Sequence, residues 1–257
     1  MKTAIIGAGN MGGAIARGLT QGTLIKAEDI TVSDPNNELL GALKAFNPNI
    51  RTTNSNQEAI SHAEMIIIAV KPWLVEKVIE RLKFNFNKQI IVSVAAGIPF
   101  SDYKEWLSPL ATVFRLVPNT AISQLASMTI IASMNATKEQ EAFILNLFNE
   151  MGLAMLIPEK QIPATTALTS CGIAYVLKYI QAAMQAGIEM GIYPKDAMKM
   201  VAQSVKGAAE LILNNDTHPS VEIDKVTTPG GITIKGINEL EHGKFTSTVI
   251  KAIKASS

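Results

Sequence analysis

Three glycines near the start of the chain have the spacing of a nucleotide-binding turn. Gly7, Gly9 and Gly12 form a Gly-x-Gly-x-x-Gly pattern in "IIGAGNMGG", after an apolar run and before a helical pattern. Gly7 allows a tight turn, Gly9 lets the backbone approach a pyrophosphate, and Gly12 lets the helix pack closely on the strand. The free amides at the helix start attract phosphates. This context predicts a dinucleotide site, with a purely structural turn as the alternative.

The next apolar run ends in "VSDPNN", where the adenosine ribose of a dinucleotide is expected. Asp34 in this position favours a free 2′-hydroxyl, and therefore NADH, over a 2′-phosphate. The same residues also form an ordinary turn in which Asp34 caps the next helix. The loop has no Arg or Lys, and Ser33 and Asn36 offer a phosphate only neutral hydrogen bonds. The residues therefore leave the choice between NADPH and NADH open.

Two further loops follow predicted strands on the edge where ligands bind in such sheets. Lys71 and Pro72 in "AVKPW" are expected to shape the loop beside the cofactor, and Lys71 is otherwise an exposed loop lysine. Asn119 in "RLVPNTA" is placed to hold the nicotinamide amide or a substrate group, and is otherwise a turn asparagine.

A proline and two glycines interrupt the helical second half of the chain in "KVTTPGGITIKG". Proline and glycine are poor helix formers, so a new helix is expected to start near Thr233. The free amides at such a start can bind a carboxylate. The alternative for Thr233 is a β-branched helix residue packed in a core.

These candidate residues require a sheet that brings strand ends together. Residues 1–160 alternate β-branched apolar runs with amphipathic stretches, which predicts a Rossmann-like, doubly wound parallel sheet. The predicted strands are 2–7, 29–34, 64–70, 89–94, 111–117, 128–133 and 153–158. The predicted helices are 11–21, 36–45, 56–63, 74–82, 101–107 and 138–151.

Residues 161–257 are predicted to form an all-helical domain, with helices at 165–190 and 195–214 and in the last 25 residues. The first two are so apolar that a single small bundle cannot hide them. We therefore expect this half to form a homodimer, with an unusually apolar monomeric bundle as the alternative.

Composition narrows the class of protein. The 257 residues are 47% hydrophobic with a formal net charge of +1, so no charge excess points to nucleic acid or an anionic membrane. No run approaches the roughly 18 apolar residues of a membrane helix, and the short first run is not typical of a signal peptide. One cysteine, three scattered histidines and no metal-ligand motif fit a cytoplasmic protein without a metal site.

Five motifs together resemble the pyrroline-5-carboxylate reductase family over the whole chain: "GAGNMG", "AVKP", "RLVPNTA", "ALTSCGIAYV" and "TPGGITIKGINELEHGKF". The resemblance implies reduction of the cyclic imine 1-pyrroline-5-carboxylate to L-proline, the last step of proline biosynthesis. It implies NADPH as the cofactor, with NADH possible because of Asp34. It also implies helical domains that interlock in a dimer, and dimers that assemble into a ring.

Carried over by position, the resemblance implies a role for each motif. Thr228 and the amides of Gly230 and Gly231 would bind the substrate carboxylate, and Thr233 would be the catalytic residue that hydrogen-bonds the ring nitrogen. The implied cofactor-binding residues are Gly7, Gly9, Asn10, Met11, Gly12, Ser33, Asp34, Asn56 near the ribose, Val70, Lys71, Pro72 and Asn119 near the nicotinamide. Asp216 would correspond to a family acid near the motif lysine.

Some residues differ from the family pattern. Thr228, Cys171, Ile173 and Val117 stand where serine, serine, proline and methionine are usual, which affects the expected substrate range. A second hypothesis is a related imine or β-hydroxy-acid dehydrogenase, which would use a lysine on the long helix, here Lys178. A third is a dinucleotide-binding regulator without catalysis. Since hydride transfer is the cofactor's own chemistry, the reductase needs few reactive side chains.

Overall fold

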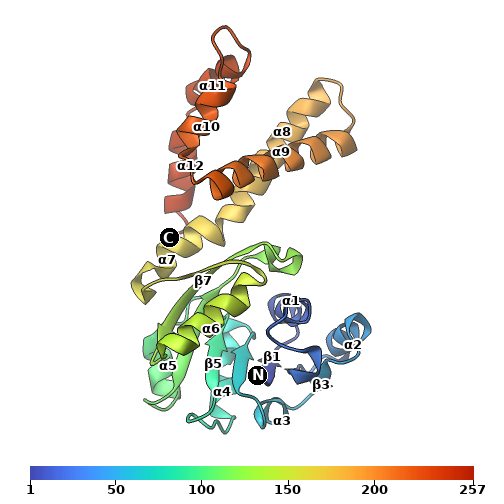
Figure 1. Cartoon of the computed structure of the whole chain (residues 1–257), viewed down its shortest axis with the longest axis vertical. Coiled ribbons are helices and arrows are strands. Elements are labelled where there is room, and N and C mark those ends of the chain that lie inside the picture. The colour runs from blue at the N-terminus through green and yellow to red at the C-terminus, as the bar shows by residue number, and fades with distance from the viewer. The chain divides into compact units, whose positions relative to one another are not determined.

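The structure, a computed structural model, describes every residue from Met1 to Ser257. The chain divides into two compact units, Met1–Ser170 and Cys171–Ser257, and each is described by itself. Figure 1 shows the strands of the first unit in blue to green with helices around them, and the helices of the second unit from yellow to red. The predicted boundary after residue 160 lies just before α7 (Ile162–Thr169), which packs against β7 of the first unit.

The first unit is built on one eight-stranded sheet with the order β3-β2-β1-β4-β5-β6-β7-β8. Its first six strands have the Rossmann order, in which ligands bind at the carboxyl ends near the junction of β1 and β4. The predicted fold class is therefore confirmed. The strands are β1 (Thr3–Ile6), β2 (Ile30–Ser33), β3 (Arg51–Thr53), β4 (Met65–Ile68), β5 (Ile90–Ser93), β6 (Thr112–Val117), β7 (Ser127–Met134) and β8 (Gly152–Leu156).

Two features of the sheet differ from the prediction. The pairing of β6 with β7 is antiparallel, whereas all others are parallel. A parallel return needs a crossover of a dozen or more residues, and only a short turn, Pro118 to Ala126, joins these strands. Strand β3 was not predicted, because its three residues, Arg-Thr-Thr, have no apolar run and lie at the sheet edge.

Apolar side chains are buried on both faces of the sheet, as the continuous strand patterns predicted. One cluster joins β1, β2, β4, β5 and β6 to α1, α2 and α6, with Phe114 and Phe148 fully buried. The other joins alternate strand residues to α3, α4 and α5, with Tyr103 fully buried. The helices are α1 (Asn10–Leu19), α2 (Asn37–Phe46), α3 (Asn56–Ile60), α4 (Val75–Glu80), α5 (Phe100–Trp106) and α6 (Lys138–Asn149).

Side-chain caps start several of these helices. Asn36 caps α2, Ser55 caps α3, and Thr137 forms a capping box with Gln140 at the start of α6. Each such cap typically contributes about 1 kcal/mol. Short 3-10 turns connect other elements: η1 (Ala27–Asp29), η2 (Pro72–Leu74), η3 (Thr120–Gln124) and η4 (Glu159–Gln161).

The second unit consists of five helices: α8 (Gly172–Glu189), α9 (Pro194–Asn215), α10 (Pro219–Val226), α11 (Thr233–His242) and α12 (Phe245–Lys254). Helices α8 and α9 pack as a hairpin, and a Cβ added at Gly187 would lie 3.2 Å from the Cβ of Ala197. The prediction of one helix over 165–190 was wrong, since α7 ends at Thr169 and α8 begins at Gly172. The Ala174 amide bonds the Cys171 carbonyl, a tighter pattern than the α-helical one.

Candidate active site

The glycine turn after β1 requires glycine at two positions. Gly7 has a φ of +103°, and its amide donates to the Ser33 carbonyl at 2.8 Å. A Cβ at Gly7 would lie 2.7 Å from the Ala69 carbonyl oxygen, and one at Gly12 would lie 2.0 Å from the Gly7 oxygen. Any larger residue at either position would therefore push the turn away from β4 or from α1.

Gly9, the middle glycine of the motif, faces open space, as a nucleotide-binding turn needs. A Cβ at Gly9 would meet no atom within 4 Å, and Gly9 is the N-cap residue of α1 without a side-chain cap bond. The amides of Asn10, Met11 and Gly12 are thus left for an anion by the helix itself. These features fit the pyrophosphate of a dinucleotide.

Both carboxylate oxygens of Asp34 have partners in the first unit. Oδ2 accepts from the Ala8 amide at 2.7 Å, and Oδ1 accepts from the Asn36 amide at 2.8 Å. The carboxylate therefore ties the loop after β2 to the glycine turn. The alternative in which Asp34 caps the next helix was wrong, because the Asn36 side chain caps α2 by accepting from the Glu38 amide.

Two other predicted residues meet beside this loop. The Ser33 hydroxyl, at the end of β2, donates to Asn56 Oδ1 at 2.8 Å. Asn56 is the first residue of α3, so its position depends on the short β3 that the sequence pattern did not reveal. The structure thus places Ser33, Asp34 and Asn56 together at the carboxyl end of β2.

The loop after β4 lies against the glycine turn. The Ala69 amide donates to the Ile6 carbonyl at 2.8 Å, and Val70 Cγ1 lies 3.3 Å from the position of a Cβ at Gly7. Lys71 precedes the 3-10 turn η2, which begins at Pro72. Lys71 is exposed and forms no ion pair, so its ammonium group is free for an anionic ligand.

Asn119 is buried and engaged within the first unit. Its Oδ1 accepts from the Ala121 amide at 3.0 Å, its Nδ2 donates to the Thr169 carbonyl at 3.4 Å, and its amide donates to Ser127 Oγ at 3.1 Å. These bonds cap η3 and reach the end of α7. A role beside the nicotinamide stays a prediction for this residue.

Arg115, in the same motif as Asn119, was not predicted to have a role. It is buried, pairs with Glu159 and lies over the Phe100 ring, and the Glu159 carboxylate also accepts from the Phe100 amide. The ion pair holds the segment that leads into α7. A charged residue inside an apolar strand pattern was the feature of the sequence that could have indicated this role.

In the second unit, residues Thr228 to Gly231 form a tight turn. Pro229 is followed by Gly230 with a φ of +73°, and the Gly231 amide donates to the Thr228 carbonyl at 3.0 Å. These are the features of a type II turn, which needs glycine at its third position. The Gly231 amide, predicted to bind a carboxylate, is therefore already engaged in the turn.

Helix α11 begins directly after this turn. Thr233 is its first residue, and no side chain caps its amides. The Thr233 hydroxyl makes no hydrogen bond within the chain, and the residue lines an open apolar groove of about 790 Å³ formed by α8, α11 and α12. A free hydroxyl and free amides thus lie together at this helix start.

Comparison with known proteins identifies the family. Residues 159–257 match the family described as pyrroline-5-carboxylate reductase dimerisation, and residues 2–97 match NADP oxidoreductase, coenzyme F420-dependent. Pyrroline-5-carboxylate reductases 1 and 2 of Dictyostelium discoideum are each 37% identical over 99% of this chain, which spans 48% of the first and 90% of the second. The chain belongs to the pyrroline-5-carboxylate reductase family.

A solved structure agrees with this assignment. Plasmodium falciparum pyrroline carboxylate reductase, crystallised with NADP bound, has a TM-score of 0.88 and 27% identity, covering 100% of this chain and 95% of its own. The predicted family is confirmed. According to the two family matches, the first unit binds a nicotinamide dinucleotide and the second contains the dimerisation helices.

Three other predicted residues lie in the second unit of this family member. Asp216 ends α9 with a φ of 49°, and Cys171 is a free, partly buried thiol at the start of α8. Lys178 donates to Gln181 Oε1 at 2.9 Å and lines the same groove as Thr233. The structure offers no group of three or more His, Cys, Asp or Glu side chains suited to a metal, and none of its helices has the length and apolar character of a membrane span.

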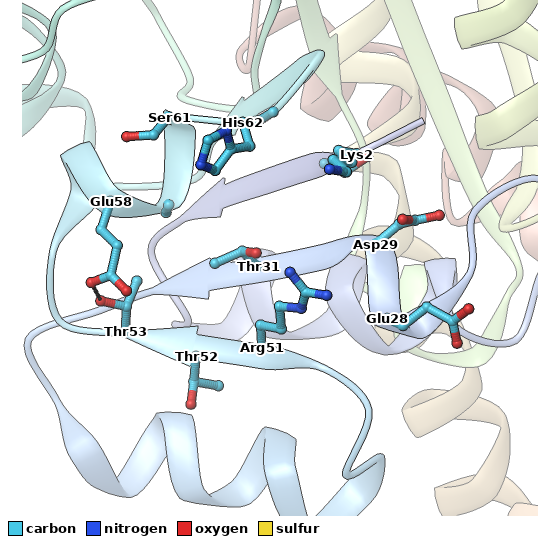
Figure 2. Close-up of a pocket in the computed structure, with 13 residues that line it drawn as sticks. Lys2, Glu28, Asp29, Thr31, Arg51, Thr52, Thr53, Glu58, Ser61 and His62 are labelled. Carbon is cyan, nitrogen blue, oxygen red and sulfur yellow. Dashed lines mark hydrogen bonds between the residues drawn. The ribbon is translucent and has the colours of Figure 1, made fainter.

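A polar hollow of about 390 Å³ lies at the starts of β1, β2 and β3 (Figure 2). Its basic residues are Lys2, Arg51 and His62, and its acidic residues are Glu28, Asp29 and Glu58, the last of which accepts from the Thr53 hydroxyl. In doubly wound sheets of this kind, ligands bind at the opposite, carboxyl ends of the strands. We therefore assign the hollow no part in the active site.

Proposed function

We propose that this chain reduces 1-pyrroline-5-carboxylate to L-proline with hydride from a nicotinamide cofactor, the last step of proline biosynthesis. The single observation that carries the proposal is the turn from Thr228 to Gly231, followed by an uncapped helix start at Thr233. A β-hydroxy-acid dehydrogenase or a non-catalytic regulator would leave this turn without a purpose. The family assignment favours neither alternative.

The proposed carboxylate site uses backbone amides and one hydroxyl. The Gly230 amide and the first amides of α11 are available, and a carboxylate at Gly231 would share that amide with the Thr228 carbonyl. The Thr228 hydroxyl lies beside this position, since a Cβ at Gly231 would be 2.9 Å from Thr228 Oγ1. Hydrogen bonds from amides to a carboxylate are charge-assisted and therefore strong.

Thr233 is the proposed catalytic residue. An imine accepts hydride more readily when its nitrogen is protonated or hydrogen-bonded, and a threonine hydroxyl donates without titrating. The proton can already be on the nitrogen from solution, in which case the Thr233 hydroxyl would accept a hydrogen bond from that N–H, and no strong general acid is needed. The bound cofactor supplies the hydride, and the protein supplies position and charge.

The cofactor is proposed to bind across the carboxyl ends of the strands. Gly7, Gly9, Asn10, Met11 and Gly12 would hold the pyrophosphate. Ser33, Asp34 and Asn56 would contact the adenosine ribose. Val70, Lys71, Pro72 and Asn119 would border the nicotinamide side. NADPH is the proposed cofactor, and the Asp34 carboxylate keeps NADH as the second choice.

The helical half is proposed to pair with a second copy of the chain. Many apolar side chains of the second unit are exposed within it, among them Leu177, Leu213 and Ile232. A ring of such dimers, a functional boundary after residue 160 and a cytoplasmic location stay predictions; the location relies on the single cysteine.

The experiment measures oxidation of NADPH and NADH by the cyclic imine. Thr233→Ala and Thr233→Val should each lower kcat by roughly a hundred-fold, the usual loss for one donor to a developing charge. Thr233→Ser keeps the hydroxyl and should retain most activity. Unchanged turnover in both Thr233→Ala and Thr233→Val would contradict the proposed mechanism.

A second variant separates the alternative enzyme class. Lys178→Met should reduce the cyclic imine at nearly the wild-type rate, because the proposed mechanism gives the lysine no role. Loss of turnover in Lys178→Met, with Thr233→Val still active, would favour a dehydrogenase that relies on a lysine. No turnover of the wild type with either cofactor would favour the regulator.

A further inference from the structure

A hollow of about 370 Å³ between α3 and α4 has an unusual lining. Lys77 of α4 and Arg81, the residue at the C-cap of the same helix, provide two positive charges, and no acidic residue lines the hollow. The rest of the lining is apolar or amide-bearing: Asn56, Gln57, Leu74, Val78 and Leu82. Two cations beside apolar side chains suit a ligand that combines a flat ring with a phosphate.

This hollow adjoins the end of β2. Asn56 lines it and accepts from the Ser33 hydroxyl at 2.8 Å, so one wall belongs to the proposed ribose site. The Gln57 side chain accepts from the Lys83 amide at 2.8 Å and donates to the Lys83 carbonyl at 3.5 Å, which ties α3 to the segment that follows α4. The two walls are therefore fixed to each other.

The acidic residue near this hollow, Asp34, has hydrogen-bond partners, whereas the two basic residues that line the hollow form no ion pair. Asp34 uses both oxygens in bonds to the Ala8 and Asn36 amides, and the loop after β2 contains no cation. Lys77 and Arg81 are exposed and form no ion pair. A phosphate monoester carries close to two negative charges at neutral pH, so it would be attracted to these two unpaired cations. Arginine suits such a phosphate because its planar fork can donate two bonds.

We infer that Lys77 and Arg81 bind the 2′-phosphate of NADPH and make this chain prefer NADPH over NADH. This inference rests on the proposed cofactor site and names the part of it that selects the cofactor. The loop after β2 contributes only neutral hydrogen bonds and the Asp34 carboxylate, so the positive charge comes from Lys77 and Arg81. The polar hollow in Figure 2 lacks this character, because acidic residues accompany its cations.

The test is calorimetric titration of the full chain with NADP⁺ and with NAD⁺, which does not depend on turnover. The double variant Lys77→Gln/Arg81→Gln should bind NADP⁺ at least about ten-fold more weakly, because charged hydrogen bonds to the phosphate are lost. Its affinity for NAD⁺ should change less than about two-fold, since NAD⁺ lacks that phosphate. Titration with 2′,5′-ADP and with 5′-AMP should show the same contrast.

Two controls accompany the double variant. Lys104→Gln removes an exposed lysine on α5 outside the hollow and should leave both affinities unchanged. Lys77→Arg keeps the charge and should keep NADP⁺ binding. Added salt should weaken NADP⁺ binding more than NAD⁺ binding in the wild type, and the difference should shrink in the double variant.

Equal losses for the two cofactors, no loss for either, or a wild type that binds NADP⁺ no more tightly than NAD⁺ would overturn the inference. Its failure is distinguishable from failure of the proposed function. A chain that loses NADP⁺ affinity as expected but never reduces the imine retains the inference alone. A chain that reduces the imine while the double variant keeps its NADP⁺ affinity retains the function alone.

Discussion

The two units of this chain bury their apolar residues to very different extents. In the first unit, large side chains such as Phe114 and Phe148 are fully buried between the sheet and its helices. In the helices of the second unit only Gly187 and Ala197 are buried, while Leu177 is 58% and Leu213 69% exposed. The first unit therefore completes its own core, and the second cannot do so with one copy of its helices.

The two units therefore obtain their stability from different sources. Each fully buried large apolar side chain contributes about 1.5–3 kcal/mol to the free energy of folding. The first unit buries such side chains within one chain. The second unit can bury its large apolar side chains only when another surface covers its helices. A matched family of dimerisation helices over residues 159–257 agrees with this need. Stability of the second unit should therefore depend on protein concentration.

Phe114→Ala should have the largest effect, because it removes a side chain from the core that the first unit completes within one chain. The ring is fully buried on β6, so its removal should cost about 3–5 kcal/mol of unfolding free energy. Chemical denaturation of the full chain measures the loss, which should not vary with protein concentration. Phe46→Ala, at a half-exposed phenylalanine of the same unit, should cost less than about 1 kcal/mol. Similar losses for the two variants would remove the contrast.

Leu240→Asp tests the dependence of the second unit on a partner. Leu240 lines the apolar groove of α8, α11 and α12, and a carboxylate covered there would be desolvated without a partner. We expect the dimer dissociation constant to rise by about a hundred-fold or more, a cost of several kcal/mol. Light scattering over a dilution series measures it. Leu110→Asp, at an exposed leucine of the first unit, should leave the dimer intact, and an effect there equal to that of Leu240→Asp would argue against the groove.

Asp34→Ala extends the comparison to the two glycine turns. In the first unit, the Asp34 carboxylate locks the turn through the Ala8 and Asn36 amides, whereas the Thr228–Gly231 turn has one internal bond. Loss of the lock should weaken NAD⁺ and NADP⁺ binding alike, each by about ten-fold, because two amides lose their acceptor. Calorimetric titration measures both. A gain in NADP⁺ affinity would instead mean that Asp34 acts mainly by repelling the 2′-phosphate.

The smallest expected effect comes from an ion pair that both units repeat. Lys138 and Ser133 donate to the Glu141 carboxylate and hold the pKa of Glu141 below its ordinary value, as Lys225 and Thr217 do for the pKa of Glu222. A lowered pKa in the folded state stabilises the protein above the ordinary glutamate pKa of 4.5, and the contribution is lost as pH falls through the lowered value. Glu141→Gln should therefore cost a few tenths of a kcal/mol, roughly, at neutral pH and nothing in acid.

Denaturation at neutral and acid pH checks this prediction. Glu222→Gln should also lower the free energy of unfolding at neutral pH, because the contribution of a surface ion pair does not depend on whether the unit has its own core. A cost of Glu141→Gln that persists in acid would mean that the side chain acts by packing and not by charge.

Much of the first unit was predictable because its strands are continuous apolar runs bounded by turn residues. The elements that escaped prediction lacked that signal: β3 is three polar residues, and the β6–β7 pairing depends on how short the connection is. The break between α7 and α8 was hidden because helical periodicity runs through it. In the candidate site, glycines were predictable since only they tolerate a positive φ or close backbone contact. The bonds of Asp34 and Asn119 were not, because residues far away in sequence supply the partners.

The two glycine turns, the Rossmann strands and the apolar helices can be read from the amino-acid sequence alone, because they follow from local conformational limits and from hydrophobic periodicity. Three features depend on the three-dimensional fold: Asp34 holds the glycine turn, the Gly231 amide is hydrogen-bonded within its own turn, and Lys77 and Arg81 line the same hollow as Asn56. Along the chain, Lys77 and Arg81 are two ordinary charges, one on a helix and one at its C-cap. They become a candidate phosphate site because the fold places both cations, and no acidic residue, around one hollow with Asn56 and Gln57 of α3.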